Sequence, residues 1–225
     1  MYNSDGLITI SQMRPRDLEH LVRTGEGKFL EFKRTTPEAG KIAREISAFA
    51  NTRGGTILIG VNDDLSISGV QGYFEEEYLL RKAAREICLP AVSIDIELVH
   101  YDELDVLVIR VPESKAKPVY TVTKKEKHVF IRRGDESVLA TETMVEVLKS
   151  ETSGEGVTFE YGEREQKLFR YLNEYGEITI EKFSHLVSVS GKNSTQILVN
   201  LVSAGILRHS IRDSIDYFSF SERNQ

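Results

Sequence analysis

Cysteine is nearly absent from this 225-residue chain, and tryptophan is absent altogether. The single cysteine, Cys88, can form neither an internal disulfide nor a thiolate zinc site, which favours a reducing compartment. No apolar run approaches the roughly 18 residues of a membrane span, and the start, MYNSDGLITI, lacks the basic and apolar regions of a secretory leader. These absences predict a soluble, cytoplasmic protein that does not bind a membrane.

The chain also lacks the glycine patterns that bind nucleotides. Neither G-x-x-x-x-G-K-[ST] nor G-x-G-x-x-G occurs, so no ATP site is expected. Basic residues do not predominate, because 29 Lys and Arg stand against 35 Asp and Glu, for a net charge of −6. That balance argues against a histone-like coat for nucleic acid. A local basic groove is still compatible with it, since screening limits the reach of distant charges to about 10 Å.

The most informative stretch is LEFKRTTPEAGKIAREISAFANTRGGTILIGVNDD, which predicts a strand, a helix, a tight turn and a buried strand in succession. In KFLEFK, charged and apolar side chains alternate, so Glu31 and Lys33 share one face of a strand. The helix is expected to begin with Thr36 as its cap and to stop before Gly54-Gly55. TILIGV is so continuously apolar that it suits an inner strand.

The fold class predicted for the whole chain is α+β, with two domains. Residues 1–150 form a mixed α/β domain, with further helices at 14–23, 74–88 and 141–149 and strands in IDIEL, LDVLVIRV and HVFIRR. Residues 151–160 are rich in Ser, Gly, Thr and Glu and are interpreted as a linker. Residues 161–225 predict three helices followed by two short strands, the layout of a winged helix-turn-helix domain.

Three carboxylates are candidate metal ligands and catalytic groups. Glu31 lies beside Lys33, Asp63 follows the buried strand, and glycines on either side of Glu26 can bend the chain toward them. Three converging carboxylates would bind Mg²⁺ or Mn²⁺, which activates water, while Lys33 would stabilise developing charge. Spacing alone leaves the simpler readings open: Glu31 as half of a solvated ion pair, Asp63 as a turn former and Glu26 as an exposed loop acid.

Basic residues with aromatic neighbours are candidates for contacting a phosphate backbone, although such runs also form ordinary solvated faces. In the third helix and the hairpin of the last domain, further polar residues are placed to contact phosphates and bases, although many winged helices dock proteins or form dimers instead. The candidates of the first domain are Lys33, Arg34, Arg53, Lys124, Lys125, Lys127, Arg132 and Arg133, and those of the second are Lys192, Asn193, Gln196, Arg208 and Arg212.

The string LEFKRT…ISAFANTRGGTILIGVNDD…SISGV resembles the Schlafen-type, Alba-like nucleic-acid-binding domain family, over about residues 14–150. In members that cleave RNA, the resemblance implies catalytic carboxylates at Glu26, Glu31 and Asp63. Those members pair two lobes in one chain and carry a zinc site, whereas this chain has one lobe. A nuclease groove would therefore require a homodimer. Prokaryotic relatives with a C-terminal helix-turn-helix are generally described as transcriptional regulators.

The leading hypothesis is a nucleic-acid-binding protein, a transcriptional regulator that binds DNA or RNA as a homo-oligomer, for which the sequence indicates no particular cofactor. The alternative is a Schlafen-type endoribonuclease with a Mg²⁺ or Mn²⁺ ion held by the three carboxylates. A third hypothesis is an interaction module whose winged helix binds protein.

Overall fold

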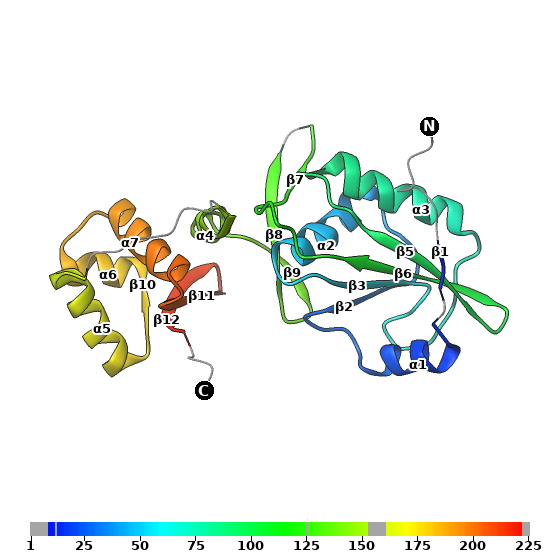
Figure 1. Ribbon diagram of the computed structural model, residues 1–225, viewed down its shortest axis with the longest axis horizontal. Helices are drawn as coiled ribbons and strands as arrows, with labels where there is room; N and C mark the ends of the chain where they lie inside the picture. The colour runs from blue at the N-terminus through cyan, green and yellow to red at the C-terminus, as the bar shows by residue number, and fades with distance from the viewer. Residues whose placement is uncertain (1–8, 12, 125, 153–160, 222–225) are drawn as a thin grey trace. The chain divides into compact units, whose positions relative to one another are not determined.

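The computed structural model describes residues 9–11, 13–124, 126–152 and 161–221 (Figure 1). The chain divides into two compact units, Met1–Leu139 and Ala140–Gln225. The sequence places the end of the first domain at residue 150 instead. The difference arises because helix α4 (Glu142–Thr152) packs against a helix of the second unit. Residues 153–160 of the expected linker lie outside the described residues.

A five-stranded sheet forms the centre of the first unit. Its strand β3 pairs in parallel with β2 and antiparallel with β6, so TILIGV occupies the predicted inner position. The strand order is β1 (Thr9–Ile10), β5 (Asp95–Tyr101), β6 (Leu104–Val111), β3 (Gly55–Ile59) and β2 (Leu30–Lys33). Strand β2 therefore forms one edge of the sheet.

Helices cover both faces of this sheet (Figure 1). Leu58 packs on the side of α1 (Pro15–Arg23), whereas Ile57 and Ile59 pack on the side of α2 (Ala39–Asn51) and α3 (Tyr73–Lys82). The alternation follows from the two-residue period of a strand. The same period places Glu31 and Lys33 of β2 on the α2 side, because Leu30 and Phe32 belong to the α1 side.

A second, four-stranded antiparallel sheet lies against α2. It contains β4 (Cys88–Leu89), β7 (Tyr120–Val122), β8 (Lys127–Arg133) and β9 (Glu136–Leu139), of which the sequence predicted only β8. Asn51, at the end of α2, fastens this sheet: its amide donates to the carbonyls of Val119 (2.8 Å) and Phe130 (3.0 Å) and accepts from the Val119 N–H (2.7 Å). The sheet and helix are thus joined by buried hydrogen bonds as well as by apolar contacts.

The predicted start of α2 at Thr36 is wrong by two residues. The helix begins at Ala39 with Glu38 in the N-cap position, and Thr36 makes no cap. Its backbone N–H instead donates to the carboxylate of Glu76 in α3, which holds Thr36 in the preceding loop. A hydrogen bond from a distant helix has outweighed the local capping preference.

The second unit contains the predicted helices and hairpin. Leu168, Phe183, Leu198 and Phe218 form its core, and the Ser190 hydroxyl caps α7 by accepting from the Asn193 N–H. Strand β10 was not predicted; it pairs with β12 to make a three-stranded sheet. The elements are α5 (Glu163–Tyr175), β10 (Glu177–Thr179), α6 (Ile180–Val187), α7 (Gly191–Ser203), β11 (Leu207–Arg212) and β12 (Ile215–Phe220).

Candidate nucleic-acid interface

Arg132 is the centre of a buried charged cluster in the first unit. Its side chain has 0% exposure, which corrects its assignment to a nucleic-acid-binding surface. The guanidinium donates to Glu31 (2.9 Å), to Glu45 of α2 (3.1 Å) and to the Gly27 carbonyl (2.7 Å), and it lies 4.6 Å from the centre of the Phe49 ring. Removing a charge from water is costly unless partners compensate it. The two carboxylates make Arg132 a structural residue that ties β8 to β2 and α2.

The three predicted metal ligands do not form a metal site. Glu31 is buried at 6% exposure, and its carboxylate pairs with Arg132 and Lys33. Glu26 accepts the backbone N–H of Phe32 (2.8 Å), and Asp63 is exposed in the turn after β3. Among the residues that the structure describes, no group of three His, Cys, Asp or Glu could hold a metal ion. The donor set for Mg²⁺ or Mn²⁺ therefore does not fit, because the nearest cations already neutralise Glu31.

Burial also changes the chemistry of Glu45. Desolvation raises the pKa of this carboxyl group, although a hydrogen bond from Ser137 and the nearby charge of Lys33 and Arg132 act in the opposite direction. Lys33, which the sequence suggested as a stabiliser of developing charge, is thus part of the same network as Glu31 and Glu45. The cluster holds the edge strand β2 in place.

Exposed cations gather instead where β2 and β3 begin. The N–H of Thr56 donates to the carbonyl of Phe29 (2.8 Å), which brings the residues before β2 beside the α2–β3 turn. The N–H of Arg132 donates to the Thr52 hydroxyl (3.0 Å), so the end of β8 reaches the same turn. Ser114 also lies there, because its N–H donates to the Ala50 carbonyl at the end of α2 (2.8 Å).

We call the side chains at this position the basic edge: Lys28, Phe29, Arg53, Lys115 and Arg133. All five are exposed, and the apolar ring of Phe29 is 49% exposed. Within the described residues, Arg53 and Lys115 have no side-chain hydrogen bond or ion pair, and Lys28 contacts only the Phe29 ring, at 5.7 Å. The sequence indicated Arg53 and Arg133 but missed Lys28 and Phe29, since a lone cation-aromatic pair is common in loops.

Two acidic groups near the basic edge, Glu136 and Glu113, are already engaged in ion pairs. Arg133 forms an exposed ion pair with Glu136 (3.0 Å), and Glu113 pairs with Lys117 (2.6 Å). Exposed pairs of this kind are worth about 0–1 kcal/mol, so a phosphate can replace the carboxylate at Arg133 at little cost. The Glu26 carboxylate is held by the β2 backbone, as described above. The edge therefore offers free positive charge next to an exposed aromatic ring.

The other candidate cations of the first unit lie elsewhere. Arg34 is exposed just after β2, at the opposite end of that strand from Lys28. Lys124 and Lys127 belong to the β7–β8 hairpin, where Lys127 lies 3.8 Å from the centre of the Tyr120 ring. Lys125 lies outside the described residues. These side chains do not join the basic edge, because β8 separates the hairpin tip from Arg133.

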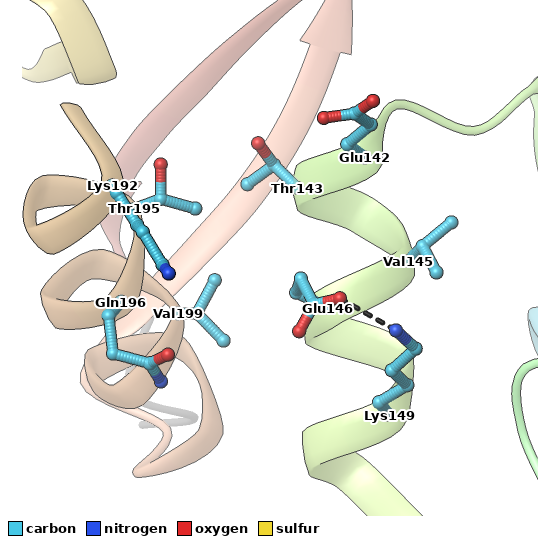
Figure 2. Close-up of a pocket in the computed structure, with 9 residues that line it drawn as sticks. All are labelled: Glu142, Thr143, Val145, Glu146, Lys149, Lys192, Thr195, Gln196 and Val199. Atoms are coloured by element: carbon cyan, nitrogen blue, oxygen red, sulfur yellow. Dashed lines mark hydrogen bonds and ion pairs between the residues drawn. The ribbon is translucent and has the colours of Figure 1, made fainter.

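In the second unit, the candidate residues divide between α7 and the hairpin. Lys192 and Gln196 extend from α7 toward α4 and line a groove between the two helices (Figure 2). Asn193 is exposed at the start of α7. Arg208 donates to the Ser219 hydroxyl (2.8 Å), and Arg212 pairs with Glu177 while lying 3.9 Å from the centre of the Tyr217 ring.

Comparison with known proteins identifies the first unit. The family model described as Schlafen, AlbA_2 matches residues 26–141, slightly more than half of the chain. The chain belongs to the Schlafen, AlbA_2 family. The resemblance that the sequence suggested is therefore confirmed for this domain, and no curated protein matches the chain at a significant level.

Two solved structures match the AlbA_2 chain in part, at low sequence identity. One is the N-terminal domain of a protein from Nitrosomonas europaea described as related to the ATP-dependent DNA helicase RecG; identity is 20% and the TM-score 0.41, with 54% of this chain and 89% of that chain covered. The other is a protein from Corynebacterium diphtheriae, at 16% identity and a TM-score of 0.47, with 80% of this chain and 33% of that chain covered. The chain thus spans about a third of the second protein.

The motif residues that carry the AlbA_2 resemblance have structural roles here. Gly54 has φ +71°, and a Cβ placed on it would lie 2.7 Å from the Val111 carbonyl oxygen. A Cβ on Gly55 would lie 2.3 Å from the Phe49 ring. Asn51 bonds the second sheet to α2, as described above. The glycines and the asparagine therefore build the turn that presents Arg53 on the basic edge.

Proposed function

We propose that this AlbA_2 protein binds nucleic acid through the basic edge of its first unit and acts as a transcriptional regulator. The observation that carries the proposal is the grouping of Lys28, Arg53 and Lys115 around exposed Phe29. Cations of this kind contact phosphates without sequence preference, and an aromatic ring adds a surface on which bases stack. Family membership supports a nucleic-acid-related function.

The second unit would supply further contacts. Its order of helix, strand, helix, helix and hairpin supports a winged-helix domain, in which α7 would be the recognition helix. Lys192, Asn193 and Gln196 are residue types that bond phosphates and base edges. The endoribonuclease alternative has no specific geometric observation in its favour, because Glu31 is neutralised by Arg132. Binding is accordingly the function we propose.

A salt titration tests the proposal. Binding of mixed-sequence DNA and RNA oligonucleotides should weaken steeply as salt rises, since phosphate contacts release counterions. The variant Lys28→Ala/Arg53→Ala removes two such contacts, so the slope of log K against log salt for duplex DNA should become shallower by about 1.8. A smaller change would follow if one cation contacts no phosphate.

The matched control is Arg16→Ala. Arg16 is an exposed cation of α1, which covers the opposite face of the sheet from α2, so its loss changes the net charge without touching the basic edge. We expect the control to keep the wild-type slope. Undetectable binding of the wild type at low salt would refute the proposal, as would equal slopes for the control and the double variant.

A further inference from the structure

The recognition helix proposed for the second unit has two opposite faces, one of them buried in the core and the other flanked by a second helix, with Lys192 and Gln196 still exposed. Ser194, Leu198 and Leu201 follow each other at helical spacing, are buried and face the unit. Leu198 and Leu201 belong to the main core. Lys192, Gln196, Val199 and Ser203 have the same spacing on the other side of α7. In a recognition helix, this second face is the one turned toward DNA.

Helix α4 lies on that second face. Val199 is buried at 3% exposure although it belongs to no part of the unit's main core cluster. The hydroxyl of Ser150 in α4 lies within hydrogen-bond distance of the hydroxyl of Ser203 in α7. Figure 2 shows Lys192, Gln196 and Val199 extending from α7 into the space between the helices, and Glu146 extending into it from α4.

The start of α4 is fixed to the hairpin. The Thr141 hydroxyl donates to Asp216 (2.7 Å), and the same carboxylate bonds the imidazole of His209 (2.6 Å). Burial by itself would raise the pKa of Asp216, but the hydrogen bonds from His209 and Thr141 outweigh it and leave the pKa lowered. The carboxylate is therefore a charged anchor for the helix start, and α4 is held at both ends.

A major groove cannot accept α7 while α4 occupies this position. The groove is about 12 Å wide, and one α-helix with its side chains has a diameter of about 10–12 Å. Two helices side by side exceed that width, and Glu142 of α4 would approach the phosphates with negative charge, whereas Glu146 is paired with Lys149 (2.7 Å). Lys192 and Gln196 are exposed, but they line the groove directly beside this obstacle.

We propose that α4 is an autoinhibitory helix that lies beside the DNA-reading face of α7, blocks its entry into the major groove and must move away before the second unit binds duplex DNA. The proposal rests on the proposed function, in that α7 is taken as a recognition helix. Because α4 directly follows the first unit along the chain, a change in the first unit could displace it. DNA binding by the second unit would then be conditional, whereas the basic edge would bind at all times.

A reversible disulfide crosslink between α4 and α7, called the staple below, tests the proposal in the full chain. Ser150→Cys/Ser203→Cys places two thiols where the hydroxyls now meet, and their oxidation would lock α4 on α7. Cys88 does not compete, because burial raises the pKa of its thiol to about 12. The oxidised pair should bind a mixed-sequence DNA duplex about tenfold more weakly than the reduced pair. The single variants Ser150→Cys and Ser203→Cys should show no effect of oxidation.

A second variant makes the test independent of disulfide formation. Thr141→Val/Ser150→Ala removes two of the side-chain bonds that hold α4 and leaves that of Thr143 to Asp216, so duplex binding should strengthen, on the order of threefold. Unchanged binding in this variant, or equal binding by the oxidised and reduced staple, would overturn the inference. The proposed function fails separately, if Lys28→Ala/Arg53→Ala leaves nucleic-acid binding intact.

Discussion

At the scale of single residues, the buried guanidinium of Arg132 holds together the charged cluster of the first unit. Arg132 satisfies two carboxylates and a backbone carbonyl, and it does so from a side chain that solvent does not reach. Buried ion clusters contribute little net stability when complete. They become costly when one partner is removed, because the remaining charges have no compensation.

Replacing Arg132 should therefore destabilise the protein severely. Arg132→Met keeps the length of the side chain but leaves buried Glu31 and half-buried Glu45 without their shared partner. The expected loss in the free energy of unfolding is about 3–5 kcal/mol, measured by urea denaturation. Arg133→Ala, at the exposed neighbouring position, should change it by less than about 0.5 kcal/mol. Similar losses in the two variants would contradict the role assigned to Arg132.

The raised pKa of Glu45 predicts a specific dependence of stability on pH. In the folded protein this carboxyl group keeps its proton to a higher pH than in the unfolded chain, whose value is near 4.5. Its contribution to stability is therefore fully present below about pH 4.5 and is lost as pH rises through the folded pKa. Relative to Glu45→Gln, the wild type should lose stability from pH 4.5 toward neutrality. A relative gain over that range would disprove the assignment.

At the scale of elements, the α2–β3 turn is the part on which the basic edge is built. Gly54 and Gly55 allow the end of α2, the start of β3 and the segment after β6 to approach within backbone contact. The sequence identified this turn, because a helical period, a glycine pair and an apolar run follow each other locally. It could not identify that Lys28 and Arg133 lie beside Arg53 at this turn, since they come from distant segments.

Substitution of Gly55 tests whether this glycine is needed because a side chain there would have no room. Gly55→Ala introduces a Cβ 2.3 Å from the fully buried Phe49 ring, so the free energy of unfolding should fall by about 1–3 kcal/mol. Gly40→Ala is the control, because nothing lies within 4 Å of a Cβ there and alanine favours the helix, by up to about 1 kcal/mol. In thermal unfolding, the melting temperature should fall for Gly55→Ala and rise for Gly40→Ala. A neutral Gly55→Ala would mean that the turn tolerates a side chain.

At the scale of the whole molecule, the features that could not be predicted from the sequence are those that depend on contacts between distant residues. The burial of Glu31 was missed because its partner Arg132 lies 101 positions away, and no local period encodes that pairing. The α4 helix was predicted at nearly its true position, but its pattern does not say which unit it packs on. The expected homo-oligomer stays a prediction. Among the described residues, no helix is long and apolar enough to cross a membrane.

The most direct measurement is photo-crosslinking to an oligonucleotide that carries bromouracil, followed by mass spectrometry of the tryptic peptides. Stacking of a base on Phe29 predicts that the crosslinked peptide is FLEFK, residues 29–33, and that Phe29→Ala abolishes this product while the protein stays folded. Crosslinks confined to α1 or to the β7–β8 hairpin, with none at Phe29, would contradict the assignment of the basic edge as the nucleic-acid interface.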